Sequence, residues 1–295
     1  MGSYFKSPPF FITIGILAFV GIIYFNFKDH YKIDYDNPSE VIIKNTWKLP
    51  RELEEVSGIV YINEKQLACV QDEMGLIYLY NIVTGKVEQT IEFGPQDDYE
   101  GIAFNGNDLF TVTSAGKIFE IKSYLSDSIA INTYQTKLSP KHDIEGFTYD
   151  PAKNQLWLAA KQNGDKDEKY KGVYAFDLTS KRFIEEPIFK LKFDNPIFKE
   201  LKNVGSKKTF RTSEIAIHPQ TKDIYMLDAK IPKLLILNRN WEAEKLIVLD
   251  PDQHPQPEGI TFSPDGKIFL SNEGEWKPAT IHQVEIKNKK ATKKK

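Results

Sequence analysis

Between residues 41 and 286, apolar and polar residues alternate over short stretches that are separated by Gly, Asp, Asn and Pro. The stretches QLACVQD, LIYLYNI and GVYAFDL are typical of these segments. A period of two residues places alternate side chains on opposite faces of an extended strand, and the abundant Ile, Val, Phe and Tyr favour strands. The pattern therefore predicts an all-β domain of antiparallel strands joined by tight turns.

One sequence unit recurs five times within this region. Each copy begins with a small or acidic residue, which is usually followed by Gly and then by an aliphatic or aromatic residue. The five copies are Ser57-Gly58-Ile59, Glu100-Gly101-Ile102, Glu145-Gly146-Phe147, Ser213-Glu214-Ile215 and Glu258-Gly259-Ile260. Their second positions are 43, 45, 68 and 45 residues apart, and two further alternating stretches follow each copy. Because a β-propeller blade repeats every ~40–50 residues, we predict a five-bladed β-propeller.

Two irregularities of the repeat bear on the number of blades. The third repeat is 23 residues longer than its neighbours, which is too short for another blade, so we expect insertions around Gln162–Lys171 and Asn195–Thr212. A six-bladed ring is the alternative. The last repeat has room for only three strands, and Val41–Leu49 is expected to supply its outer strand. Closing the ring in this way removes exposed sheet edges.

An apolar run precedes the repeats. The 21 residues between Lys6 and Lys28 carry no charge, and as a helix they would span about 31 Å, which matches a bilayer core. A cleaved signal peptide is the competing interpretation, but its apolar region is usually shorter and ends in small residues. We therefore expect a membrane anchor over residues 1–28 and a tether over 29–40. This topology places the propeller, residues 41–286, outside the cytoplasm.

Charge and cysteine content narrow the function classes. The formal net charge is −2, but residues 33–286 carry 30 Lys and Arg against 40 Asp and Glu, a net charge of −10. An acidic body argues against nucleic acid as the ligand, since phosphate binding needs clustered Lys and Arg. Cys69 is the single cysteine, which excludes an internal disulfide and a multi-cysteine zinc site. The lysine-rich tail, 287–295, is expected to be disordered.

Several phrases resemble one bacterial family. They are LEEVSGIVY, LACVQDEMGLIYLY, DYEGIAF, DIEGFTYDP, AIHPQTKDIYML and QPEGITFSPDGKIFLSNEG. These phrases are similar to those of the SdiA-regulated (YjiK-like) family, over about residues 41–286. The resemblance implies a membrane-anchored β-propeller on the extracytoplasmic side of the bacterial inner membrane, a link to calcium, and no established catalytic activity. The chain departs from the family pattern at Ser213-Glu214, where Glu replaces the usual Gly.

The repeat register brings many acidic residues to one face. In a propeller, the start of each inner strand and the end of each second strand lie at the same mouth of the central channel. Ten carboxylates occupy such positions: Glu55, Asp72, Glu73, Asp98, Glu100, Asp143, Glu145, Asp228, Glu258 and Glu273. Crowded like charges raise one another's pKa or recruit a cation, and calcium takes six to eight oxygen ligands. Arg211, Lys161 and Lys230 are the opposing cations.

We therefore predict a calcium-type cation at this mouth. The ring symmetry makes Glu100, Glu145 and Glu258 the first candidate ligands, and Asp72, Asp228 and Asn272 the second. A repeated Glu-Gly also has a structural interpretation, in which the carboxylate accepts backbone N–H groups of the next blade. His142 and His254 fall in loops on the same face, where either could act as a general base beside a metal-bound water. An exposed histidine without chemistry is the alternative for both.

Three functions follow from these features. The first is a membrane-anchored binding or sensing module that presents the acidic face to a protein or small-molecule ligand. The second is a metal-dependent hydrolase of lactones or phosphate esters, in which the metal activates water. The third is a structural scaffold without a ligand, which a channel filled by side chains would favour.

Overall fold

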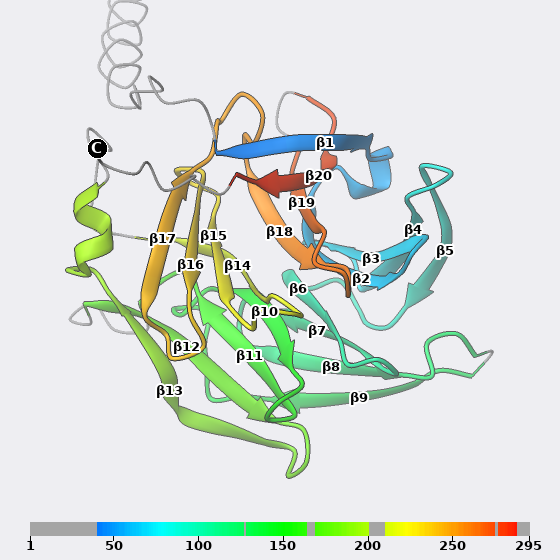
Figure 1. Cartoon of the computed structure of the whole chain (residues 1–295). Helices are drawn as coiled ribbons and strands as arrows, with labels where there is room; N and C mark the ends of the chain where they lie inside the picture. The colour runs from blue at the N-terminus through cyan, green and yellow to red at the C-terminus, as the bar shows by residue number, and fades with distance from the viewer. Residues whose placement is uncertain (1–39, 127, 164–168, 201–209, 275–276, 288–295) are drawn as a thin grey trace, which may run out of the picture.

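Five four-stranded antiparallel sheets surround a common axis (Figure 1). The computed structural model describes residues 40–126, 128–163, 169–200, 210–274 and 277–287. Within this part of the chain, the strands run in sequence order from the centre outward in four of the five sheets. The protein is an all-β, five-bladed propeller, so the predicted blade number is confirmed.

Each blade contributes one strand to each of four concentric positions. The innermost strands are β2 (Val56–Asn63), β6 (Tyr99–Phe104), β10 (Ile144–Asp150), β14 (Thr212–Ile217) and β18 (Pro257–Phe262). The second strands are β3 (Gln66–Gln71), β7 (Leu109–Thr113), β11 (Gln155–Ala160), β15 (Ile224–Asp228) and β19 (Ile268–Asn272). The third strands are β4 (Leu76–Asn81), β8 (Lys117–Lys122), β12 (Tyr170–Asp177), β16 (Lys233–Leu237) and β20 (Thr280–Ile286). The outermost strands are β5 (Lys86–Glu92), β9 (Ala130–Gln135), β13 (Arg182–Lys192), β17 (Ala243–Val248) and β1 (Val41–Lys48).

The ring is closed by β1, the first strand in the described part of the chain, as predicted. Strand β1 pairs with β20 in an antiparallel register that runs from Val41 opposite Ile286 to Lys48 opposite Thr280. The indole Nε1–H of Trp47 donates to the carbonyl of Ile82 at 2.7 Å, which fixes the closing strand to the following blade. Two short 3-10 helices, η3 (Arg51–Leu53) and η4 (Pro196–Glu200), lie in the connections.

The hydrophobic core lies in the five seams between neighbouring blades. Each cluster of buried side chains combines residues of two adjacent sheets, such as Trp157 of β11 with Met226 of β15. Glycines at the starts of the inner strands allow these strands to approach one another. A Cβ on Gly101 would lie 2.5 Å from the Cβ of Phe147 in the next blade, closer than two carbon atoms can approach. The repeated Gly is therefore needed for close backbone packing around the axis.

Every inner strand carries a β-bulge at the same place. The pairing with the second strand shifts between Val56 and Gly58, and the equivalent shift occurs once in each of the other four blades. The bulged residues are Ser57, Glu100, Glu145, Ser213 and Glu258. A bulge leaves one residue out of the ladder and redirects its side chain. The first residue of each sequence repeat is thus the one that the fold removes from regular pairing.

Three predicted segments fall largely or wholly outside the described residues. They are the anchor (1–28), the tether apart from Glu40, and the tail after Lys287. None of the helices in the described part of the chain has the length and apolar character to cross a membrane.

Candidate cation site

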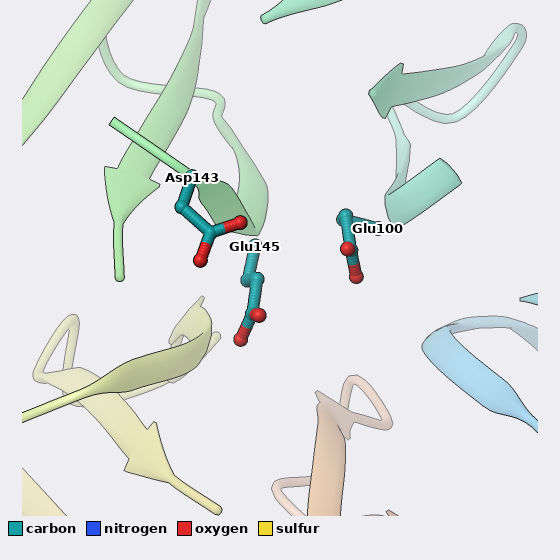
Figure 2. A group of neighbouring side chains, drawn as sticks. All are labelled: Glu100, Asp143 and Glu145. Carbon is teal, nitrogen blue, oxygen red and sulfur yellow. The ribbon is translucent and has the colours of Figure 1, made fainter. Parts of the chain in front are cut away.

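Three carboxylates lie together at the mouth of the channel. Glu100 comes from β6, Glu145 from β10, and Asp143 directly precedes β10 (Figure 2). One oxygen atom of each side chain lies within 4.8 Å of the other two. An ion at the centre of three oxygens that lie at most 4.8 Å apart would be at most about 2.8 Å from each, close to the calcium–oxygen distances of about 2.3–2.6 Å in proteins. We call Glu100, Asp143 and Glu145 the acidic triad.

Local backbone geometry positions the acidic triad. Glu100 and Glu145 are bulged residues, which explains why their side chains leave the regular alternation of the sheet. Asp143 has φ of 53°, in the left-handed region that non-glycine residues rarely occupy. Its carbonyl accepts the N–H of Lys161 at 2.7 Å, which holds the segment against the end of β11. Backbone strain of this kind is often retained at functional sites.

Glu145 has unused hydrogen-bonding capacity in the interior. Its residue exposure is 4%. Atom Oε1 pairs with the ammonium group of Lys161, whereas Oε2 is buried and has no hydrogen-bond partner among the described residues. Burying a carboxylate oxygen without a partner is costly. A cation at the acidic triad would supply the missing partner.

The carboxyl pKa values show the same charge imbalance. Burial, followed by the charges of Glu145 and Asp98, raises the pKa of Glu100 to about 9. The pKa of Glu145 is raised well above its usual range by burial and by Glu258, although Lys161 opposes this shift. A positive ion would stabilise the ionised forms and lower these pKa values again.

Glu258 belongs to the same charge cluster but lies outside the acidic triad. Burial raises its pKa to about 8 against the opposing effect of Lys161, and the charges of Glu273 and Glu100 add to the increase. Neither carboxylate oxygen of Glu258 belongs to the set of oxygens, from Glu100, Asp143 and Glu145, that lie within 4.8 Å of one another. Of the three first candidate ligands, the structure brings Glu100 and Glu145 together and adds Asp143, which the sequence placed among the ten carboxylates but not among the ligands.

The second candidate ligands lie in three different environments. Both oxygens of Asp228 are engaged: Oδ1 accepts the N–H groups of Lys230 and Ile231, and Oδ2 accepts the N–H of Arg211 and pairs with Lys233. Asp228 therefore organises the turn after β15. The structure does not bring it to the acidic triad.

Asp72 is half-buried, and its pKa is raised to about 6 by burial, with Glu55 and Glu73 as the next causes. Asn272 donates from Nδ2 to Thr280 at 3.2 Å, and its Oδ1 is buried beside His254. Neither residue belongs to the acidic triad.

Glu214 is a site residue that the sequence interpretation missed. Its Oε1 accepts the N–H of Phe147 at 2.6 Å and its own neighbour's N–H, from Ile215, at 2.8 Å. Its Oε2 is buried without a partner among the described residues. Burial raises its pKa well above the usual range, with Glu258 and Glu145 contributing. The repeat shows that Glu replaces Gly at this position. That replacement adds a further carboxylate to the channel mouth, where the charges of Glu258 and Glu145 act on it.

The two candidate histidines do not reach the acidic triad. His142 bonds within its own turn, where Nδ1 lies 3.2 Å from the N atom of Ser139. His254 is fully buried, with its ring centroid 5.1 Å from that of His282. The expectation that His254 is an exposed loop residue is therefore wrong, because its loop folds into the seam between the fourth and fifth blades.

An apolar collar closes the channel below the acidic residues. It consists of Ile59, Ile102, Phe147, Ile215 and Ile260, which are at most 2% exposed. These side chains also line a cavity of about 100 Å³ between the five inner strands. The channel is thus partly filled by side chains, and the acidic triad lies at one of its mouths.

Comparison with known proteins agrees with this architecture. The model of the SdiA-regulated family matches residues 47–277. The chain belongs to the SdiA-regulated family. No match was found among curated proteins. Solved structures with the same fold as this SdiA-regulated protein include glutaminyl cyclase of Myxococcus xanthus, with 12% identity over 84% of this chain and 97% of that chain, and a TM-score of 0.57.

Two more distant structures are similar over much of their length. Streptogramin B lyase shares 11% identity over 83% of this chain and 98% of that chain, with a TM-score of 0.47. A nidogen/laminin complex shares 14% identity over 74% of this chain and 72% of that chain, with a TM-score of 0.47. At these identities the comparison concerns the fold and not the activity.

Proposed function

We propose that this SdiA-regulated protein is a binding or sensing module that holds a calcium-type cation at the acidic channel mouth. The observation that carries the proposal is the acidic triad with the buried, unpartnered Oε2 of Glu145. An oxygen-only ligand set favours a hard divalent cation. The bound cation would then present the acidic face to a protein or small-molecule ligand.

Calcium fits this site better than magnesium. Magnesium requires near-octahedral geometry at about 2.0–2.1 Å, whereas calcium accepts irregular sets at longer distances. Two members of the acidic triad are fixed by β-bulges and the third by a left-handed backbone. The fold therefore sets the backbone positions of the three ligands without octahedral symmetry, and such an irregular set suits the larger ion better. Backbone carbonyls and water would complete the coordination.

The test is a calorimetric titration of the full-length chain, purified in detergent and stripped with a chelator. We expect calcium to bind and magnesium to bind more weakly. Glu145→Gln should reduce calcium affinity by about tenfold or more, since it removes a charged ligand. Glu285→Gln is the matched control because Glu285 is an exposed partner of Lys44 on the rim. Absence of calcium binding by the wild-type protein at millimolar concentrations would rule the proposal out.

The proposed location is the extracytoplasmic side of the bacterial inner membrane. It is supported by the uncharged run between Lys6 and Lys28, which has the length of a bilayer-spanning helix. Fractionation of cells with protease added to spheroplasts tests this location. Protection of the propeller from external protease would contradict it.

A metal-dependent hydrolase is the second candidate function. It is favoured by Glu258, which lies outside the acidic triad and whose pKa burial raises to about 8, so that this carboxyl group holds a proton near neutral pH in the cation-free protein. A carboxyl group in that state can act as a general acid beside a metal-activated water. A panel of lactones and phosphate esters with calcium added tests this alternative. Turnover that is lost in Glu258→Gln while calcium binding persists would favour it.

A further inference from the structure

Lys161 occupies a position that no other blade gives to a cation. It is the first residue after the second strand of its blade. The residues at this position in the five blades are Asp72, Ser114, Lys161, Ala229 and Glu273. The equivalence extends to the backbone: the N–H groups of Ser114, Lys161 and Glu273 donate to the carbonyls of Asp98, Asp143 and Gln256.

The side chain of Lys161 extends into the carboxylate cluster. Its ammonium group pairs with Oε1 of Glu145. Glu258 and Asp143 are the next carboxylates that act on it. The ammonium group of Lys161 is therefore paired with Glu145, one of the three carboxylates that would bind a free cation. In this state Lys161 partly neutralises charges that would otherwise repel one another in the interior.

A free divalent cation and this ammonium group cannot both use Glu145 without mutual repulsion. Like charges a few ångströms apart repel strongly where water is scarce. The Lys161 side chain is 31% exposed, compared with 5% for Glu145. A long, flexible lysine stem allows the ammonium group to turn toward solvent while the carboxylate stays in place.

The backbone around Lys161 is fixed, so this exchange requires only a side-chain rotation. The backbone N–H of Lys161 donates to the backbone carbonyl of Asp143 at 2.7 Å, and that of Gln162 donates to the backbone carbonyl of His142 at 2.9 Å. We propose that Lys161 is a tethered counter-ion, which occupies the acidic triad when no free cation is bound and leaves Glu145 when a divalent cation binds. This inference rests on the proposed cation site. It makes Lys161 the residue that sets the calcium threshold, which is the calcium concentration at which the site becomes half occupied.

A permanent structural ion pair makes the opposite prediction for a lysine substitution. If Lys161 only stabilises Glu145, its loss weakens the fold without improving cation binding. If Lys161 competes with the cation, Lys161→Met lowers the melting temperature of the calcium-free protein but raises calcium affinity by about tenfold or more. Saturating calcium should then restore the melting temperature of the variant to near the wild-type value.

The experiment is a calcium titration by calorimetry on the full-length wild-type protein, Lys161→Met and Lys230→Met. Lys230 follows the same strand end in the next blade and is exposed, and Lys161, not Lys230, is the lysine whose charge acts on Glu100 and Glu145. Lys230→Met thus removes the same charge from the same face and should change affinity by less than about twofold. Lys161→Arg retains a cation and should keep the wild-type threshold.

The outcomes separate this inference from the proposed function. If neither wild type nor Lys161→Met binds calcium, the proposed cation site is wrong. If wild type binds and a folded Lys161→Met binds equally or more weakly, the tethered counter-ion is overturned while the cation site stands. Acetic anhydride labelling of the wild-type protein, read by peptide mass spectrometry, does not depend on the variant's folding. Lys161 should be labelled faster with calcium than with chelator, and an unchanged rate contradicts the inference.

Discussion

The carboxylate of Glu214 crosses the seam between two blades and accepts the backbone N–H of Phe147. The same oxygen also accepts the N–H of Ile215. The structural interpretation of the repeated Glu-Gly is a carboxylate that accepts backbone N–H groups of another blade. Glu214, the one residue that replaces Gly in the repeat, makes these hydrogen bonds. Glu100 and Glu145, which precede Gly in their repeats, belong to the acidic triad instead.

Substitutions of Glu214 should separate its hydrogen bonds from its charge. Burial holds its pKa well above the usual range, so Glu214→Gln retains an acceptor and changes little. Glu214→Ala removes the acceptor for two N–H groups and should lower the free energy of unfolding by about 1–3 kcal/mol. Urea denaturation in chelator measures both values. Equal losses in the two variants would show that the acceptor role is unimportant.

The calcium-free protein should lose stability as the pH rises. The folded-state pKa of Glu258 is about 8, above its ordinary value of 4.5. The folded state therefore retains a proton that the unfolded chain releases, and the stability present below pH 4.5 is lost as the pH rises through 8. Denaturation in chelator at pH 6 and pH 8.5 tests this.

Two comparisons make that pH experiment specific. Glu258→Gln should reduce the loss, because an amide does not titrate, whereas Glu285→Gln should not. Calcium should also reduce the loss, since a bound cation stabilises the ionised carboxylates. An identical pH dependence in wild type and Glu258→Gln would refute the prediction.

A second pH effect is expected on the acid side. Burial, followed by the charge of His282, lowers the pKa of His254 from 6.5 to about 4. The unfolded chain then takes up a proton between pH 6.5 and 4 that the folded state does not, so stability falls as the pH falls. Between pH 7 and pH 5, His254 should account for a loss of about 2 kcal/mol in the free energy of unfolding.

His254→Gln should therefore lose less stability than wild type over that interval. The matched control is His142→Gln, since His142 is only partly buried in its own turn. If His142→Gln reduces the acid loss as much as His254→Gln does, the assignment to the buried histidine is wrong.

Asp143 combines a candidate ligand with an unusual backbone, and two substitutions distinguish these roles. Asn tolerates a left-handed φ better than other side chains do, so Asp143→Asn should preserve stability and reduce calcium affinity by about tenfold. Asp143→Ala should lose affinity and also about 1 kcal/mol of stability, because of its backbone conformation. Calorimetry and thermal unfolding report the two quantities. A variant Asp143→Asn with wild-type calcium affinity would remove Asp143 from the ligand set.

The number of blades and the closing strand could be predicted because both depend on local patterns. The alternation within Val41–Leu49 predicts a strand that precedes the first repeat and so is available to complete the last one. The spacing of the repeats predicts the number of blades. The bulged glutamates were also identified, since each stands at a fixed place in its repeat. The positions of Glu100 and Glu145 at one mouth follow from that register.

The remaining features of the site depend on how blades approach one another. Asp143 joins the acidic triad through a left-handed backbone that no residue pattern specifies. Glu214 bonds to a neighbouring blade, and His254 is buried in a seam, so both depend on packing between segments far apart in the sequence. Such contacts are invisible to periodicity, which describes each strand by itself.

The closing strand has a mechanical consequence. The N–H of Lys287 donates to the carbonyl of Glu40 at 2.8 Å, so the chain enters and leaves the propeller at one point on the rim. A pull on the segment before Glu40 would act first on the pair Val41 and Ile286, where β1 joins β20. The strand that locks the ring is therefore also the first to receive tension from any attachment at the N-terminal side. Under force, the molecule would open at this seam, one hydrogen-bonded pair at a time, before the acidic mouth on the inner strands is disturbed.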